Sequence, residues 1–361
     1  MLPRPKASIL NIEPYKAGIS KVKGSSKKII KLSSNETPLG ASPKAIAAYM
    51  DMANNLHRYP DSSASELRQA IGEVHNLSPD RIVCGAGSDE ILSLLCVAYL
   101  SEGDEALYSE YGFLMYPIST MAAGGIPKKA GEKNLTTNVD SILASVTEKT
   151  RIVFIANPNN PTGTYINRNE IRRLRKGLPA NVLLVLDSAY AEYVIENDYT
   201  AGEDIVDMGE NTVMTRTFSK IYGLAGLRLG WAYCPEPIAD ILNRVRGPFN
   251  VSSPAIAAGI AAVRDVEFIN HARSYNQACL TQVCGEINKI GLKAYKSSAN
   301  FFLVEFPQGN KNSKNADQFL KDHGIIVRAI DSYGLANYLR FTVGSEEDNR
   351  FVVDVLKEFL Q

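Results

Sequence analysis

Lys220 is the residue whose neighbours most favour covalent chemistry. Its segment reads TFSK over residues 217–220, and GLRLG follows at 226–230. Small and apolar neighbours can exclude water from an amine, which lowers its pKa and leaves a neutral amine able to attack an aldehyde. Arg228 and the hydroxyls of Thr217 and Ser219 could bind a phosphate group nearby. A Ser-Lys pair alone is more often a solvated surface pair, so the hypothesis depends on the whole segment.

Asp187 is the second candidate, because it ends the apolar run 182–186. A buried carboxylate without a partner is costly, and a protonated pyridine nitrogen would be a suitable partner. A ring kept cationic in this way can stabilise a carbanion. Tyr190 and Asn160, the latter in the turn-forming stretch NPNNPTG at 157–163, could reach a hydroxyl on the same ring. Alone, Asp187 could equally cap a helix, and 157–163 could be a simple turn.

A third candidate is an anion site at the start of a predicted helix. Gly87, Ser88 and Asp89 follow the apolar run 81–84 and precede an apolar helical pattern at 91–100. Backbone N–H groups at a helix start, together with the helix dipole, attract a phosphate. Without the other motifs, the same residues would indicate only an N-cap with an acidic first turn.

These candidates follow apolar runs that predict one parallel sheet. The runs at 81–84, 151–155, 182–186 and 212–214 are short, rich in β-branched residues and apolar on both faces, as strands covered by helices must be. Ligands bind beyond the carboxyl ends of such strands. We therefore predict an α/β domain in which the polar clusters that end the four runs converge on one site.

The rest of the chain predicts an arm and a smaller domain. Residues 1–36, with three prolines and a basic stretch at 21–28, are typical of an arm, and the large domain is expected over 37–250. Beyond Pro254 a helical pattern continues to about Ile290. A hairpin-like stretch at 299–304, strands at 325–328 and 338–343 and a terminal helix come after it. Residues 251–361 therefore indicate a smaller α+β domain, which we expect to pack with the N-terminal arm.

Composition narrows the choice of partners. The 361 residues are 45% hydrophobic and 22% charged, and 39 basic side chains balance 39 acidic ones, so no net field attracts nucleic acid. The five cysteines lack metal-like spacing and indicate reduced core residues rather than a metal site. The sequence has no signal-peptide pattern and no apolar run of about 20 residues, so we expect a cytoplasmic enzyme that acts on small molecules away from membranes.

Seven motifs together resemble those of the histidinol-phosphate aminotransferases, in the same order and over nearly the whole chain. They are LSSNETPLG (32–40), RYPD (58–61), GSDE (87–90), NNPTG (159–163), DSAY (187–190), the segment 217–231 and LRFTVG (339–344). The resemblance implies fold type I of the transferases that depend on pyridoxal 5′-phosphate (PLP), with a mostly parallel seven-stranded sheet between helices. It also implies a homodimer whose subunits share their active sites.

The same resemblance assigns roles to the candidate residues. Lys220 would form a Schiff base with PLP, Asp187 would pair with the pyridinium nitrogen, and Tyr190 and Asn160 would bind the ring hydroxyl. Tyr59 would reach in from the other subunit. The residues around the cofactor phosphate would be Gly87, Ser88, Asp89, Thr217, Ser219 and Arg228.

The aromatic residue that the family stacks on the PLP ring is less clearly placed. The family pattern is Pro-Thr-aromatic-x-x-Tyr, whereas this chain reads EYGFLMY at 110–116. The aromatic-x-x-Tyr spacing predicts Phe113, and the position before Gly112 predicts Tyr111. Phe113 is our prediction, although either ring could belong to the core.

Substrate choice should depend on anion-binding groups outside the cofactor site. Arg340 lies within an apolar strand pattern and Arg328 ends another, and guanidinium groups suit a carboxylate or phosphate. By resemblance, these two residues with Tyr15 and Asn35 would form the substrate site. Histidinol phosphate would be the amino donor, and glutamate with 2-oxoglutarate the second pair. Tyr15 could equally be a packed residue of the arm.

Three alternatives remain open from the sequence. The stretch DSYGL at 331–335 also resembles relatives that accept aromatic amino acids, so transamination of phenylalanine or tyrosine is the nearest one. A PLP-dependent decarboxylase or lyase could use the same residues. A non-catalytic PLP-binding module would normally be joined to a DNA-binding domain, which the short arm and the balanced charge do not favour.

Overall fold

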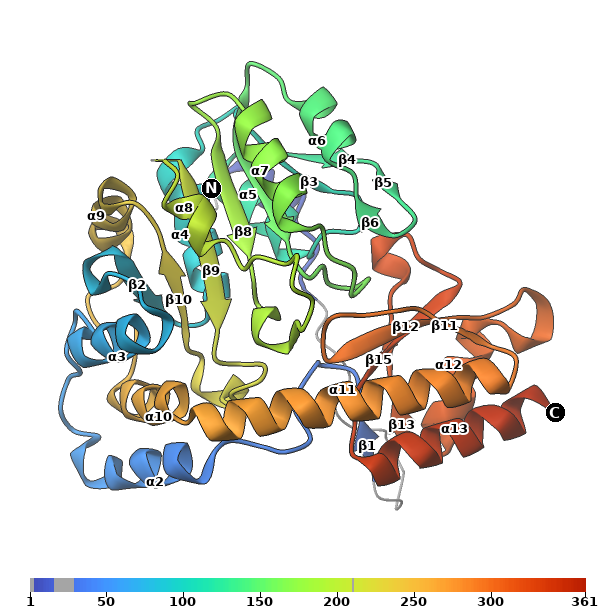
Figure 1. The fold of residues 1–361 in the computed structure, drawn as a ribbon. Helices are drawn as coiled ribbons and strands as arrows, with labels where there is room; N and C mark the ends of the chain where they lie inside the picture. Colours follow the sequence, from blue (N-terminus) through green and yellow to red (C-terminus); the bar gives the residue numbers. More distant parts are fainter. Residues whose placement is uncertain (1–2, 16–28, 210) are drawn as a thin grey trace.

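The largest element is a seven-stranded sheet (Figure 1), in a computed structural model that describes residues 3–15, 29–209 and 211–361. In order across the sheet, its strands are β2 (Ile82–Gly85), β10 (Gly230–Tyr233), β9 (Thr212–Thr217), β8 (Leu183–Asp187), β7 (Thr150–Ala156), β3 (Glu105–Ser109) and β4 (Ile126–Ala130). All neighbours pair in parallel except β10, which is antiparallel to both β2 and β9. The predicted α/β fold with a mostly parallel seven-stranded sheet is confirmed.

Helices cover both faces of this sheet, because central strands such as β7 and β8 are apolar on both sides. Leu183 and Val185 of β8 join one apolar cluster with α4 (Ser88–Tyr99), α5 (Met115–Ala123) and α9 (Glu236–Val245). Leu184 and Leu186 of the same strand join another with α6 (Val139–Ser145), α7 (Arg168–Gly177) and α8 (Glu203–Val206). The alternation follows the two-residue period of a strand.

A smaller antiparallel sheet lies beside the large one (Figure 1). Its strands, in order, are β11 (Lys293–Ala294), β12 (Phe301–Glu305), β15 (Tyr338–Thr342) and β14 (Arg328–Ala329). The helices α12 (Ser313–Asp322) and α13 (Glu346–Leu360) share an apolar cluster with it. A separate short hairpin joins β5 (Glu132–Lys133) to β6 (Thr136–Thr137).

The strand predicted at 325–328 is wrong as a single element. Its first part forms β13 (Ile325–Ile326), which pairs in parallel with β1 (Ile30–Lys31), and its last part belongs to β14. The cause is the N-terminal segment, whose Leu32 N–H donates to the carbonyl of Ile326 at 2.7 Å. Residues 30–32, close to the start of the chain, therefore pair with Ile325 and Ile326 through backbone hydrogen bonds.

The helical pattern predicted from Pro254 to about Ile290 is interrupted once. The structure has α10 (Ser253–Arg264) and α11 (Val266–Lys289), with Asp265 between them at φ −85° and ψ 63°. The Asp265 carboxylate accepts hydrogen bonds from Ser42 Oγ at 2.5 Å and Lys44 Nζ at 2.8 Å. Figure 1 shows α11 extending from beside the large sheet to the small one.

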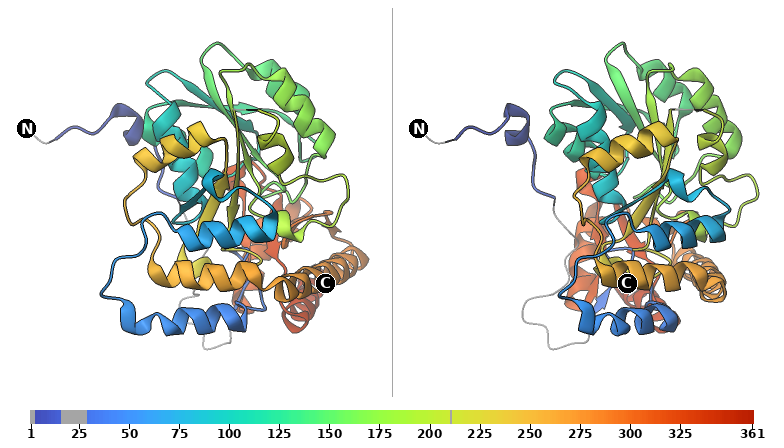
Figure 2. Two further views of the ribbon diagram at one scale, coloured as in Figure 1. Left: turned by 60° about the vertical axis from the view of Figure 1, so that its left-hand side comes forward. Right: turned by 90° about the vertical axis from the view of Figure 1, so that its left-hand side faces the viewer.

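The remaining α-helices pack on other helices. α2 (Pro43–Asp51) and α3 (Ser65–His75) pack with α10, and α1 (Ala7–Leu10) lies next to α5. Figure 2 shows residues 3–6, before α1, extending away from the rest of the chain. Short 3-10 helices cover 53–55, 79–81, 191–193, 225–227, 309–311 and 331–333.

The predicted division into domains stays a prediction. The basic stretch at 21–28 of the expected arm lies outside the described residues. Leu32 packs in the apolar cluster of the small sheet, whereas residues of α10 pack with α2 and α3. Leu32 of the expected arm thus contacts the small sheet, and the packing of α10 with α2 and α3 crosses the border proposed after residue 250.

Candidate active site

One cavity of about 270 Å³ lies at the carboxyl ends of β7, β8 and β9 and brings the predicted clusters together. Predicted residues in its wall are Tyr15, Asn35, Ser88, Asp89, Phe113, Asn160, Asp187, Tyr190, Thr217, Ser219, Lys220, Arg228, Arg328 and Arg340. They come from the large sheet, the start of α4, the small sheet and the N-terminal segment. Convergence of the strand ends is the geometry expected of a parallel α/β sheet.

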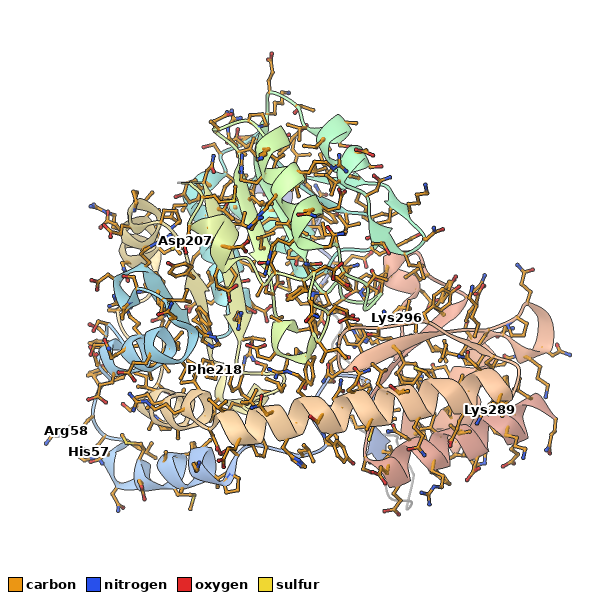
Figure 3. The ribbon with its side chains drawn as sticks, viewed as in Figure 1. His57, Arg58, Asp207, Phe218, Lys289 and Lys296 are labelled. Carbon is orange, nitrogen blue, oxygen red and sulfur yellow. The ribbon has the colours of Figure 1, made fainter. Side chains whose placement is uncertain are left out.

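Lys220 lies in a turn that follows β9. The backbone N–H of Leu224 donates to the carbonyl of Phe218 at 3.0 Å, and the fully buried Phe218 packs inside the molecule (Figure 3). Burial, and secondarily the positive charge of Arg340, lowers the pKa of the Lys220 amine to about 8. Its Nζ lies 5.6 Å from the centre of the Tyr190 ring. The amine is therefore far more often neutral near physiological pH than a solvated lysine.

Asp187 is the last residue of β8, and it is only 6% exposed. Its Oδ2 accepts a hydrogen bond from the Tyr116 hydroxyl at 2.9 Å, and its Oδ1 a long one from Thr215 Oγ1 at 3.4 Å. Burial raises the pKa of the Asp187 carboxyl to about 6, and these hydrogen bonds oppose the rise. A cationic ring nitrogen would stabilise the ionised carboxylate, so the site fits a pyridinium group.

Residues predicted to bind the cofactor phosphate lie together at the start of α4. Gly87, at φ 87°, precedes the helix, and a Cβ atom there would lie 2.5 Å from Nη2 of Arg228. The Arg228 guanidinium donates to Ser219 Oγ at 3.3 Å and to Asp89 Oδ2 at 3.4 Å. Thr217 Oγ1 accepts from the Ser219 backbone N–H at 3.1 Å. A helix start and a guanidinium thus face one space that fits a phosphate group.

Asn160 and Tyr190 already have partners that the sequence did not indicate. Asn160 Oδ1 accepts from Arg340 Nη1 at 2.5 Å, so its amide NH₂ is the group left to serve a ring hydroxyl. The Tyr190 hydroxyl accepts from Asn35 Nδ2 at 2.9 Å. Asn35 is thus in contact with the predicted cofactor ligand Tyr190, in addition to its place in the cavity wall.

The predicted substrate residues lie in the same cavity. Arg340, which is 5% exposed, also donates through Nη2 to the carbonyl of Ser33 at 2.9 Å. Each of its terminal nitrogens carries a second N–H that can donate to an anion. The Arg328 guanidinium carbon lies 6.0 Å from the centre of the Tyr15 ring. The small sheet and the N-terminal segment therefore supply a second cationic region.

The three aromatic residues predicted to contact the cofactor, Phe113, Tyr111 and Tyr59, lie in different places. Phe113 lines the cavity, whereas Tyr111 packs with Leu303 and its neighbours outside it, so the position favours Phe113 as the stacking ring. Tyr59 is 81% exposed and stacks on Phe249 at 4.5 Å, so it is not part of this cavity in its own chain. His57 and Arg58, next to it, project from the outer edge of the molecule (Figure 3).

Tyr116 is the residue that sequence reasoning missed. It belongs to α5 rather than to any of the four strand-end clusters, yet its hydroxyl bonds to the predicted pyridinium partner. The aromatic-x-x-Tyr spacing contained the signal, because the tyrosine that ends it is Tyr116. That spacing was used only to choose between Phe113 and Tyr111.

The fold and this site define a family. Residues 27–356 match the family model of aminotransferase class I and II, and the chain belongs to this family, whose members depend on PLP and act on small molecules. A histidinol-phosphate aminotransferase of Paramagnetospirillum magneticum is 53% identical over 359 residues, covering 99% of both chains. Another from Rhodopseudomonas palustris is 50% identical, covering 99% of this chain and 98% of the relative.

A solved structure agrees with these relatives. The crystal structure of histidinol-phosphate aminotransferase from Sinorhizobium meliloti, in complex with pyridoxal-5′-phosphate, matches with a TM-score of 0.92 at 25% identity. The match covers all of this chain and 98% of the other. Among the described residues, no helix is long and apolar enough to cross a membrane, and no group of three His, Cys, Asp or Glu side chains could hold a metal ion.

Proposed function

We propose that this enzyme transfers the amino group of histidinol phosphate to 2-oxoglutarate with PLP as its cofactor. The observation that carries the proposal is the presence of two cationic regions in one cavity, Arg228 at the start of α4 and Arg328 with Arg340 from the small sheet. One region suits the cofactor phosphate and the other the phosphate of the substrate. Relatives named histidinol-phosphate aminotransferase, at 50% and 53% identity, support the same substrate.

Each residue around the cofactor would bind a different part of PLP. Bound PLP supplies an aldehyde that condenses with amines and a ring that takes up electrons. Lys220 would provide the amine that holds it, and Asp187 would accept the pyridinium N–H. Tyr190 and the amide of Asn160 would donate to the ring hydroxyl, with Phe113 against the ring face. The phosphate would lie at the start of α4, beside Arg228.

Lys220 would also move the proton during the reaction. Once the substrate amine has displaced it, its neutral amine can remove a proton from the substrate carbon that bears nitrogen and return that proton at the adjacent cofactor position. In the cofactor-free protein, burial already lowers the pKa of this amine to about 8, which favours its neutral form relative to a solvated lysine. The second half of the reaction would use the same groups in reverse with the oxo acid.

The finer statements about assembly and location belong to the same proposal. The chain would form a homodimer in which Tyr59 reaches the active site of the partner, which accords with its exposure and its distance from the cavity of its own chain. Its five cysteines are free, as is usual in a reducing cytoplasm, and we propose that location.

A half-reaction titration tests the substrate. The enzyme with bound PLP is mixed separately with histidinol phosphate, phenylalanine, tyrosine and glutamate, and the loss of the cofactor's visible absorbance is followed. We expect histidinol phosphate to react at the lowest concentration and glutamate to react as the second donor. A preference for phenylalanine by orders of magnitude would replace histidinol phosphate with an aromatic amino acid.

Lys220→Ala provides the matched control for this titration. The variant should bind PLP but lose turnover by several orders of magnitude, since it lacks the amine that moves the proton. Substantial remaining transamination would contradict the assignment of Lys220. Release of carbon dioxide or ammonia from the wild type without an oxo acid would instead indicate a decarboxylase or lyase.

A further inference from the structure

Tyr116 connects the predicted pyridinium partner to the aromatic core. Its side chain is 1% exposed, and its ring stacks on Phe154 of β7 with centroids 4.8 Å apart and planes 3° apart. Its edge meets Phe113, which lines the cavity, at 5.9 Å and 90°. Packing on these sides fixes the ring, so the position of its hydroxyl is fixed as well.

The hydroxyl of Tyr116 makes the better of the two side-chain hydrogen bonds to Asp187. It lies 2.9 Å from Oδ2, whereas Thr215 Oγ1 lies 3.4 Å from Oδ1, near the limit of a useful hydrogen bond. The other groups that act on this carboxyl are the backbone N–H of Ala189 and the charge of Asp89 from α4. Tyr190, on the segment that follows β8, also interacts electrostatically with this carboxyl.

We propose that Tyr116 is a positioning residue of the reaction, whose hydroxyl holds the Asp187 carboxylate ionised and turned to accept the pyridinium N–H. The inference rests on the proposed function, because Asp187 has this partner only if PLP binds as described. A hydroxyl held by packing behind a carboxylate restricts its rotation and adds a donor to its charged form. Tyr116 itself does not line the cavity, so we expect it to act through Asp187.

The test replaces only the hydroxyl. Tyr116→Phe keeps the ring that stacks on Phe154, and Tyr108→Phe is the matched control. Tyr108 is also a buried tyrosine of the same apolar cluster, and its ring meets that of Tyr116 at 6.2 Å. For each protein we would measure the PLP dissociation constant, kcat and KM for the amino donor, and the infrared carboxyl band of Asp187 in the cofactor-free protein, as the difference from Asp187→Asn.

We expect Tyr116→Phe to weaken PLP binding by about tenfold and to lower kcat, with little change in KM, because the lost hydrogen bond served the carboxylate that would accept the pyridinium N–H. The carboxyl band should show Asp187 protonated up to a higher pH than in the wild type. The reason is that burial raises the pKa of this carboxyl and the Tyr116 hydrogen bond opposes the rise. Tyr108→Phe should change none of these quantities.

Unchanged PLP affinity and an unchanged carboxyl band in Tyr116→Phe would overturn the inference, as would equal effects of the two variants. If Tyr116→Phe does not fold, the wild-type carboxyl band remains decisive, since a band typical of a carboxyl without a strong hydrogen bond would also overturn it. Failure of the proposed function can be distinguished from failure of this inference. In that case the wild type would not bind PLP, whereas the carboxyl band would still report on the hydrogen bond between Tyr116 and Asp187.

Discussion

Burial acts on two residues of the cavity and disfavours the charged form of each. The Lys220 amine loses water, so its neutral form is favoured, and the Asp187 carboxyl loses water, so its ionised form needs a partner. An amine that is neutral can bond to an aldehyde, and a carboxylate that lacks a cation can bind a pyridinium. The chemistry of both residues therefore follows from their desolvation.

The pKa of Lys220 gives a prediction at this scale. In the cofactor-free protein, the rate at which Lys220 reacts with a small aldehyde and borohydride should reach half its maximum near pH 8. Below that pH the amine is protonated and unreactive, and above it the amine is neutral. Peptide mass spectrometry can measure the labelling of Lys220, and Lys220→Ala provides the blank. A midpoint near 10.5, the ordinary value for lysine, would show that the amine is not desolvated.

The sequence was sufficient to predict that candidate residues which are close neighbours in the chain line the same cavity. Lys220 with Arg228, or Asp187 with Tyr190, lie within ten residues of each other and at the ends of apolar runs. The contacts it could not predict join distant positions. Tyr116 lies 71 residues from Asp187, and Asn35 lies 155 residues from Tyr190. No local pattern specifies such pairs, because packing of separate elements brings them together.

At the scale of elements, β10 closely approaches the start of α4, where we propose that the cofactor phosphate binds. A Cβ atom at Gly230 would lie 2.3 Å from the backbone nitrogen of Ser88 and 2.9 Å from the carbonyl oxygen of Arg216. Both contacts are with backbone atoms, which cannot move aside as a side chain can. Glycine at this position therefore lets the antiparallel strand pass directly beneath the helix start.

Gly230→Ala should consequently lower the free energy of unfolding by about 1–3 kcal/mol, the usual cost of overpacking. Gly226→Ala is a suitable control, since a Cβ atom there would meet nothing within 4 Å. Urea unfolding of both cofactor-free variants measures the difference. Equal stability of the two variants would mean that β10 and α4 can separate without cost.

Elements were predictable where hydrophobic periodicity is strong and less so where a distant segment intervenes. The four runs that became β2, β7, β8 and β9 were recognised because both of their faces are apolar. The break at Asp265 depends on Ser42 and Lys44, which lie more than 200 residues away. The division of 325–328 likewise depends on residues 30–32.

At the scale of the whole molecule, the site is assembled from parts that are far apart in the chain, and we propose that a second subunit completes it. A complementation experiment tests that proposal. Lys220→Ala and Tyr59→Ala would be mixed in equal amounts and refolded together. If Tyr59 serves the partner's site, each mixed dimer has one intact site, and about a quarter of the wild-type activity should return. Activity equal to the mean of the two parents would place Tyr59 in its own chain's site.

The 24 residues of α11 form one continuous helix, so a small change in its direction at one end produces a large displacement at the other. At 1.5 Å per residue the helix is about 36 Å long, so a tilt of about 5° at its first turn would displace its far end by about 3 Å. The first turn of α11 follows Asp265, whose carboxylate accepts hydrogen bonds from Ser42 and Lys44. A displacement of that size is comparable to the length of a hydrogen bond. Because α11 packs on the small sheet, we expect its direction at Asp265 to affect the contact between Arg340 on that sheet and Asn160 in the turn after β7.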